Sequence, residues 1–269
     1  MKKLGLMAAL PAFMLVMGLS TGAAAQSTWN LSSAGCTVVG SGTGTTAGCA
    51  QGVTTASVSG WANTGAGGVY ARATVTDQGA SGIGMLSGAE TGAAPDHAID
   101  SNGNQELVLL NFGTDKISLS QVKTGWSQND TDVAVLRWNG ATGPDLTTMT
   151  TSGGTDGLIA KGWQLVASGD LDGVAANTNA VYGVGTLNIA AGAASSSWWI
   201  ISSYFSGNAA LDAGNDYFKL LSFTGTCTGG AAAGGACGPA GQAPEPTSLA
   251  LVGLALAGVV GTRRVKKQS

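Results

Sequence analysis

Asp132-Val133-Ala134-Val135-Leu136-Arg137-Trp138 is a short run in which the side chains fall into two alternating sets. Val133, Val135 and Arg137 share one face of an extended chain, and Ala134, Leu136 and Trp138 share the other, because strand side chains point alternately to opposite sides. This alternation, with its β-branched and aromatic residues, predicts a β-strand. We expect the face with Leu136 and Trp138 to point toward the core.

Similar runs occur on both sides of this one, separated by Gly, Asn and Asp rather than by helical segments. They cover residues 53–61, 68–75, 106–112, 116–122, 162–168, 182–189, 198–205 and 217–223. Strands spaced this closely, with turns between them, predict an all-β fold. We expect a single β-sandwich domain, of which a jelly roll is one version.

The first 25 residues have the composition of a targeting segment. Met1-Lys2-Lys3 precedes an apolar run over residues 4–19, and Ala23-Ala24-Ala25 ends the segment with small side chains. This order predicts a secretory signal peptide that signal peptidase removes after Ala25. Pro11 interrupts the apolar run, which argues against a buried or membrane-spanning helix.

The last 26 residues consist of three parts with different physical properties. Pro244-Glu245-Pro246 favours an extended, accessible backbone, because proline joins neither a regular helix nor a central strand. Residues 249–261 are apolar, and basic residues follow them and favour the cytoplasmic side of a membrane. As a helix this run would measure roughly 20 Å, against about 30 Å for a hydrocarbon core. A transient, processed span therefore fits better than a permanent one, although a plain C-terminal anchor is the alternative.

These three parts, in this order, resemble the PEP-CTERM sorting signal of Gram-negative bacteria. The matching residues are Pro244, Glu245, Pro246, Arg263 and Arg264. The resemblance implies recognition by an exosortase, a membrane cysteine protease that cuts near the triplet. It also implies export, a transient inner-membrane anchor formed by the C-terminal helix, and delivery to the cell surface, outer membrane or extracellular matrix. Residues 95–170 are similar to a set of exosortase-dependent surface proteins, which adds no reaction.

The sequence thus divides into a signal peptide (1–25), a β-sandwich (26–224), a Gly/Ala-rich stalk (225–243) and a sorting signal (244–269). Residues 26–243 keep six Lys and Arg against 14 Asp and Glu, a net charge of −8. Nucleic acid is excluded as an expected partner, because phosphate contacts need clustered cations.

Cysteine usage agrees with an exported domain. Cys36 and Cys49 lie near its start, and Cys227 and Cys237 near its end. Four cysteines allow three pairings, and local pairing of Cys36 with Cys49 and of Cys227 with Cys237 closes the shortest loops. Zinc is the alternative, but the spacing lacks Cys-x-x-Cys and His97 is the only histidine.

One segment carries oxygen side chains at alternate positions: Asp100, Asn102, Asn104 and Glu106. Such residues in a tight turn can converge on Ca²⁺, the only cofactor that the sequence suggests. A β-turn without an ion is the alternative, because Asn-Gly favours tight turns. Two further acidic groups, Asn129-Asp130 with Asp132 and Asp170 with Asp172, are expected at loop positions, as solvated loop ends or a second ion site.

No catalytic arrangement stands out in the sequence. His97 follows Asp96, but the nucleophile elbow Gly-x-Ser-x-Gly is absent. Trp198 and Trp199 point to opposite sides of a strand, so one of them is expected outside the main core, lining a glycan groove, a partner surface or a second cluster.

Three functions follow as hypotheses. The first is a non-enzymatic component of the cell surface or extracellular matrix. The second is a carbohydrate- or Ca²⁺-dependent adhesin that binds extracellular polysaccharide through Trp198 or Trp199 and the Asp100 turn. The third is a secreted hydrolase.

Overall fold

The computed structural model describes residues 26–32, 35–39, 46–51, 54–88, 90–151, 157–171, 180–203 and 215–229. The signal-peptide region, the stalk beyond residue 229 and the sorting signal lie outside these ranges. The chain divides into two units, and all described residues belong to the unit Ala24–Pro244.

The described domain consists of antiparallel strands and three short 3-10 helices. The first strands are β1 (Gln26–Asn30), β2 (Cys36–Val39), β3 (Thr46–Gln51), β4 (Thr54–Ala62), β5 (Ala71–Asp77), β6 (Ile83–Leu86), β7 (Ile99–Asp100) and β8 (Glu106–Asn111). The others are β9 (Lys116–Gln128), β10 (Asp132–Trp138), β11 (Trp163–Asp170), β12 (Val181–Tyr182), β13 (Gly185–Asn188), β14 (Trp198–Ser202) and β15 (Tyr217–Gly229). The 3-10 helices are η1 (Ala66–Gly68), η2 (Gly79–Ser81) and η3 (Leu146–Thr148).

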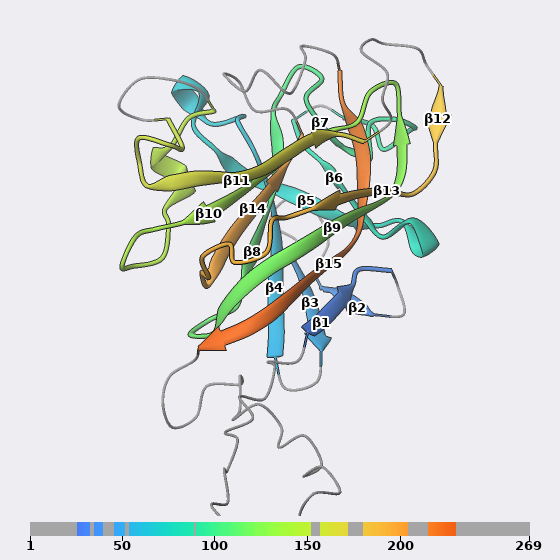
Figure 1. Ribbon diagram of the computed structural model, residues 1–269. Coiled ribbons are helices and arrows are strands. Elements are labelled where there is room, and N and C mark those ends of the chain that lie inside the picture. The colour runs from blue at the N-terminus through green and yellow to red at the C-terminus, as the bar shows by residue number, and fades with distance from the viewer. Residues whose placement is uncertain are drawn as a thin grey trace, which may run out of the picture. The chain divides into compact units, whose positions relative to one another are not determined.

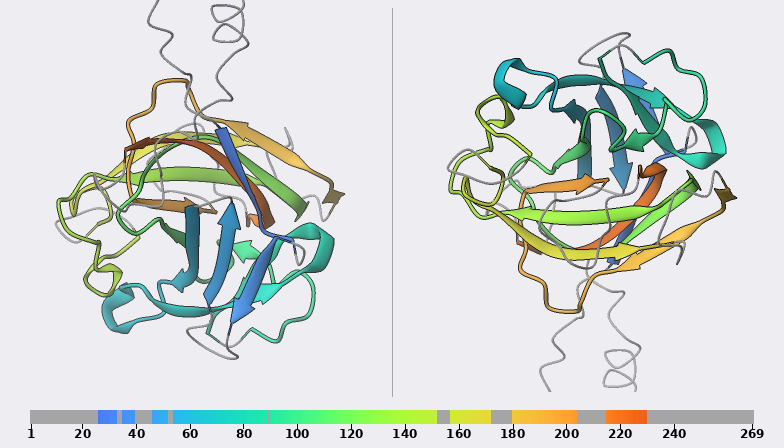
Figure 2. Two further views of the ribbon diagram at one scale, coloured as in Figure 1. Left: turned by 90° about the horizontal axis from the view of Figure 1, so that it is seen from below. Right: turned by 90° about the horizontal axis from the view of Figure 1, so that it is seen from above.

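The strands form two layers, so the predicted all-β sandwich is confirmed (Figures 1 and 2). One layer follows the order β11-β10-β14-β8-β4, and the other contains β6-β15-β9-β12. Strand β5 joins the layers, because residues 71–73 pair with β4 whereas residues 74–77 pair with β6. A single strand that turns the corner makes the two layers one continuous sheet.

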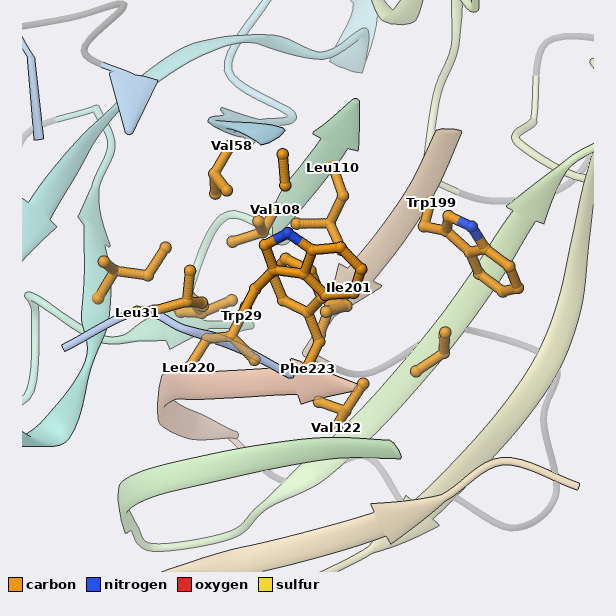
Figure 3. Close-up of a cluster of buried hydrophobic side chains, with 14 of the residues drawn as sticks. Trp29, Leu31, Val58, Val108, Leu110, Val122, Trp199, Ile201, Leu220 and Phe223 are labelled. Atoms are coloured by element: carbon orange, nitrogen blue, oxygen red, sulfur yellow. The ribbon is translucent and has the colours of Figure 1, made fainter. Parts of the chain in front are cut away.

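The main core fills the space between the layers (Figure 3). Trp29 of β1 stacks on Phe223 of β15 with ring centroids 5.2 Å apart, and Phe112 meets the edge of Trp29 at the same distance. Val133 and Val135 of β10 point into this core. The prediction that the opposite face of β10 lies on the main core side is therefore wrong.

That opposite face is buried in a second cluster on the outer side of the layer. Ala134 and Leu136 pack there with Ile200 of β14. The segment between β10 and β11 supplies Leu146 and Leu158 as a cover. Both faces of β10 are therefore buried, which explains why the alternation of side-chain types did not reveal the core side.

Each predicted run overlaps a strand; residues 182–189 contain the end of β12 and all of β13, and residues 53 and 204–205 of the predicted runs lie outside the described residues. The predicted end of the sandwich is wrong. Strand β15 continues to Gly229, so residues 225–229 belong to the sandwich and not to a stalk. Gly225 allows this continuation, because a Cβ atom there would lie 2.9 Å from the carbonyl oxygen of Ser118 in β9. Gly225 therefore allows β15 and β9 to lie close together and does not indicate a flexible stalk.

The disulfide between Cys36 and Cys49 is confirmed. The two residues face each other across the β2–β3 pair, with Cα atoms 4.4 Å apart. Cys227 is also disulfide-bonded, whereas Cys237 lies outside the described residues.

Replacing Cys36 and Cys49 together with serine is expected to lower the free energy of unfolding by about 3 kcal/mol. The reason is that the bond closes a loop with a sequence separation of 13, and the open chain regains that entropy when it unfolds. Urea unfolding of the oxidised protein measures the difference. Thr37→Ser, an exposed change in the same hairpin, is the control and should leave the midpoint unchanged. An unaltered midpoint in the double variant would contradict a stabilising role.

Candidate functional site

Acidic side chains gather at one end of the sandwich, where β8, β10 and β15 begin and β7 and β11 end. Strand pairing brings these residues to the same end: Asp132 faces Asp170 across β10–β11, and Asp100 faces Tyr217 across β7–β15. We call this region the acidic end. Its residues are Glu90, Asp96, Asp100, Glu106, Asp130, Asp132, Asp170 and Asp216.

The first half of the acidic end is built around Glu106, at the start of β8. Glu106 is 0% exposed and Asp100 is 1% exposed. The backbone N–H of Asp100 donates to Glu106 Oε2 at 3.2 Å, and the backbone N–H of Ser87 donates to Glu90 Oε2 at 2.5 Å. Three carboxyl groups from the β6–β8 region therefore lie in one neighbourhood.

Burial and like charges raise the pKa values of these groups. Burial is the larger cause for Asp100, whose pKa rises to about 8, and the charges of Glu90 and Asp96 add to it. The same two causes raise the pKa of Glu106 well above its usual range, with Asp100 and Glu90 as the charged neighbours. Among the described residues, every charged group that shifts these two pKa values is another carboxyl.

Of the predicted calcium ligands, Asp100 and Glu106 are joined by a hydrogen bond, whereas the side chains of Asn102 and Asn104 lie against other residues. Asn102 is exposed, and its Oδ1 accepts a hydrogen bond from Asn215 at 3.3 Å. Asn104 lies beside Gly88. The backbone N–H of Asn102 donates to Asp100 Oδ1 at 3.0 Å, an Asx turn of the kind that the alternative hypothesis expects.

The second half of the acidic end brings together two groups that are distant in the sequence, Asp130 with Asp132 and Asp170. Carboxylate oxygens of Asp130, Asp132 and Asp170 lie within 4.8 Å of one another. Asp172, predicted beside Asp170, lies outside the described residues. Oxygen atoms at this separation suit a hard cation.

Asp216 connects the two halves. Its Oδ1 accepts a hydrogen bond from the backbone N–H of Asp132 at 2.8 Å, and its Oδ2 accepts one from the Ser101 hydroxyl at 3.1 Å. Burial raises its pKa to about 8, with a further contribution from the charges of Asp132 and Asp130. Sequence reasoning missed Asp216 and Glu90, because only strand register and loop packing bring them to this place.

Asp96 and His97 do not adopt the arrangement of a catalytic pair. The Thr91 hydroxyl donates to Asp96 Oδ2 at 3.1 Å. His97 Nδ1 is buried and makes no hydrogen bond within the described part of the chain. In a catalytic pair the Asp96 carboxylate would orient the imidazole. Here it accepts a hydrogen bond from the loop residue Thr91 instead.

The two adjacent tryptophans lie on opposite faces of β14, as predicted. Trp199 is fully buried in the main core, and its Nε1 donates to the carbonyl oxygens of Ile117 and Ser196, both at 3.2 Å. A ligand-stacking role does not fit that position. Trp198 is half-buried against the second cluster, and Gly143 lies against its ring.

Both ends of the described chain leave the sandwich opposite the acidic end (Figure 1). Strand β15 starts at the acidic end with Tyr217 and finishes at Gly229. Gln26, the first residue of β1, pairs with Thr226 near that finish.

Comparison with known protein families identifies one segment. The family model of the PEP-CTERM protein-sorting motif matches residues 242–265, which include the Pro-Glu-Pro triplet and both arginines. No curated protein and no solved structure is significantly similar to the chain. Within the described residues no helix has the length and apolarity to cross a membrane, and the predicted span at 249–261 lies outside them.

The chain therefore carries a PEP-CTERM sorting signal, and exosortase dependence follows from it. The signal implies an exported protein that is anchored in the membrane through this segment, processed by exosortase and delivered to the cell surface.

Proposed function

We propose that the exported domain is a non-enzymatic component of the cell surface, outer membrane or extracellular matrix. The observation that carries this proposal is the position of the two chain ends. Strands β1 and β15 both leave the sandwich opposite the acidic end, so the acidic end is not on the side of the domain from which the chain continues to the sorting signal.

The start of β1 supports removal of the signal peptide by signal peptidase. Gln26 is the first residue of the strand and already pairs with Thr226. A cut after Ala25 therefore removes the apolar segment and leaves the whole edge strand in place.

The loop around His97 supports a role without catalysis. Hydrolysis by a Ser-His-Asp arrangement needs an acidic group that holds the imidazole in one orientation. Here the Asp96 carboxylate accepts hydrogen bonds from the backbone and hydroxyl of Thr91 instead.

A second candidate is a Ca²⁺-dependent adhesin that binds extracellular polysaccharide. The acidic end favours it, because a bound cation can bridge protein carboxylates and the oxygen atoms of a glycan. Binding on a glycan array in CaCl₂ that disappears in EDTA would support this candidate over the first.

Genetic complementation tests the proposal with the full-length chain. Deleting the gene is expected to alter the cell surface or matrix, measured as surface-associated protein and matrix mass. A variant with Asp96→Asn and His97→Gln is expected to restore the wild-type surface, because its fold and export are intact. An exported variant that fails to restore it would favour the hydrolase hypothesis instead.

A further inference from the structure

A cavity of about 350 Å³ lies beside the end of β10 that is away from Asp132. One wall consists of the end of β10 and the start of β11, and the other is the loop that follows β13. The volume falls within the range of small-molecule sites, about 300–1,000 Å³. The lining residues are Arg137, Gln164, Leu165, Val166 and residues 190–194.

Strand register brings the two polar residues of this cavity to one face. Arg137 faces Trp199 across β10–β14, and Trp199 lies in the main core. Gln164 faces Arg137 across β10–β11. Because residues directly opposite each other in an antiparallel pair share a face, Arg137 and Gln164 both lie on the core side of their layer. They form the polar part of the first wall.

The second wall is held in place by β9 and leaves room for a ligand. The Ser118 hydroxyl donates to the carbonyl oxygen of Ala193 at 2.6 Å, and the Ile189 backbone N–H donates to the carbonyl oxygen of Ser120 at 2.9 Å. Residues 190–194 read Ala-Ala-Gly-Ala-Ala, so no side chain in this wall is larger than a methyl group. The space in front of the guanidinium therefore stays open.

Arg137 is half-buried and forms no ion pair within the described residues. A guanidinium has five N–H donors. In the described part of the chain, one of them is used by the side chain, where Arg137 Nη2 donates to Gln164 Oε1 at 2.6 Å. The other arginine of the exported domain, Arg72, lies over the Trp61 ring at 5.0 Å. Arg137 thus offers a positive charge and several donors to an anion in the cavity.

The charge of the surroundings favours a carboxylate over a phosphate. A carboxylate accepts two parallel N–H bonds from one guanidinium and carries a single charge. A phosphate brings more negative charge into a domain whose net charge is −8, and no second cation lines this cavity. Asp132 lies five residues from Arg137 along β10, about 16 Å at the rise of a strand. That distance exceeds the screening length of about 8 Å at physiological salt, so the acidic end does not cancel the attraction.

We propose that this cavity binds a uronic acid, with the carboxylate on Arg137 and a ring hydroxyl on the Gln164 amide. An amide both donates and accepts, as a hydroxyl requires. Asn139 Nδ2 donates to Gln164 Oε1 at 3.3 Å and helps to hold this amide in place. The methyl groups of residues 190–194 suit the C–H face of a sugar ring. The site is separate from the acidic end, and it is independent of whether the domain is a structural component or a Ca²⁺-dependent adhesin.

NMR titration of the isotope-labelled mature protein with sodium D-glucuronate tests the site, in a buffer with EDTA. Glucuronate is expected to shift the backbone N–H signals of residues 190–194 along a saturable curve. Arg137→Gln is expected to raise the dissociation constant about ten- to a hundredfold, because charge-assisted hydrogen bonds are lost. Arg137→Lys should give an intermediate value, since it keeps the charge but lacks the planar fork. EDTA removes Ca²⁺, so the result does not depend on the adhesin hypothesis.

Arg72→Gln is the matched control, because it removes the other arginine of the domain and should leave the dissociation constant unchanged. D-glucose has the same ring without the carboxylate and should bind about tenfold more weakly or less. An absence of shifts with glucuronate up to about 50 mM would overturn the proposal. A dissociation constant that Arg137→Gln leaves unchanged would also overturn it. Tighter binding of inorganic phosphate than of glucuronate would contradict the assignment of the ligand as a carboxylate.

Discussion

Replacing Pro244, Glu245 and Pro246 together with alanine is expected to leave the chain uncut and retained in the inner membrane. The triplet lies within the matched sorting motif, and its two prolines keep the backbone extended for a protease. Alanine favours a helix that continues into the apolar residues at 249–261, which hides the cleavage region. Immunoblots of inner-membrane, outer-membrane and medium fractions measure the outcome.

Pro239→Ala is the matched control, because it removes a proline just outside the motif. It is expected to reach the surface like the wild type. Normal surface delivery of the triple-alanine variant would show that the triplet is dispensable. It would contradict processing of this chain by exosortase.

Trp199→Ala is expected to lower the free energy of unfolding by about 3–5 kcal/mol, because it empties a fully buried site between the layers. The change also removes an indole N–H that donates to two carbonyl oxygens. Trp198→Ala is the matched comparison on the adjacent position, and a smaller loss is expected since Trp198 is half-buried. Chemical unfolding followed by circular dichroism measures both.

This pair also tests the adhesin hypothesis. If glycan binding exists and uses the tryptophans, Trp198→Ala should weaken it while the domain stays folded. Equal stability losses in the two variants would contradict the assignment of Trp198 to the outer cluster.

The sequence predicted most strands because alternation is a local property. Runs such as residues 106–112 and 132–138 contain enough β-branched and aromatic side chains to favour a strand without their partners. The strands that it missed are β1, β2, β3, β6 and β7. Strand β3 reads Thr-Ala-Gly-Cys-Ala-Gln, which has weak strand propensity and depends on pairing with β2 and β4.

The candidate site was harder to predict from the sequence, because the register of the paired strands decides which acidic residues become neighbours. Asp132 and Asp170 are neighbours only since β10 and β11 pair in one particular alignment. Glu90 accepts a hydrogen bond from the Ser87 backbone N–H through loop packing that no spacing rule describes. The core side of β10 was predicted wrongly for a related reason, because the segment after it folds back and buries the outer face.

The most direct test of the central claim is the intact mass of the native protein from the surface fraction. Processing at both ends predicts a chain that begins at Gln26, ends near Pro246 and lacks the apolar C-terminal segment. A chain that ends at Ser269 and is found in the inner membrane would contradict it.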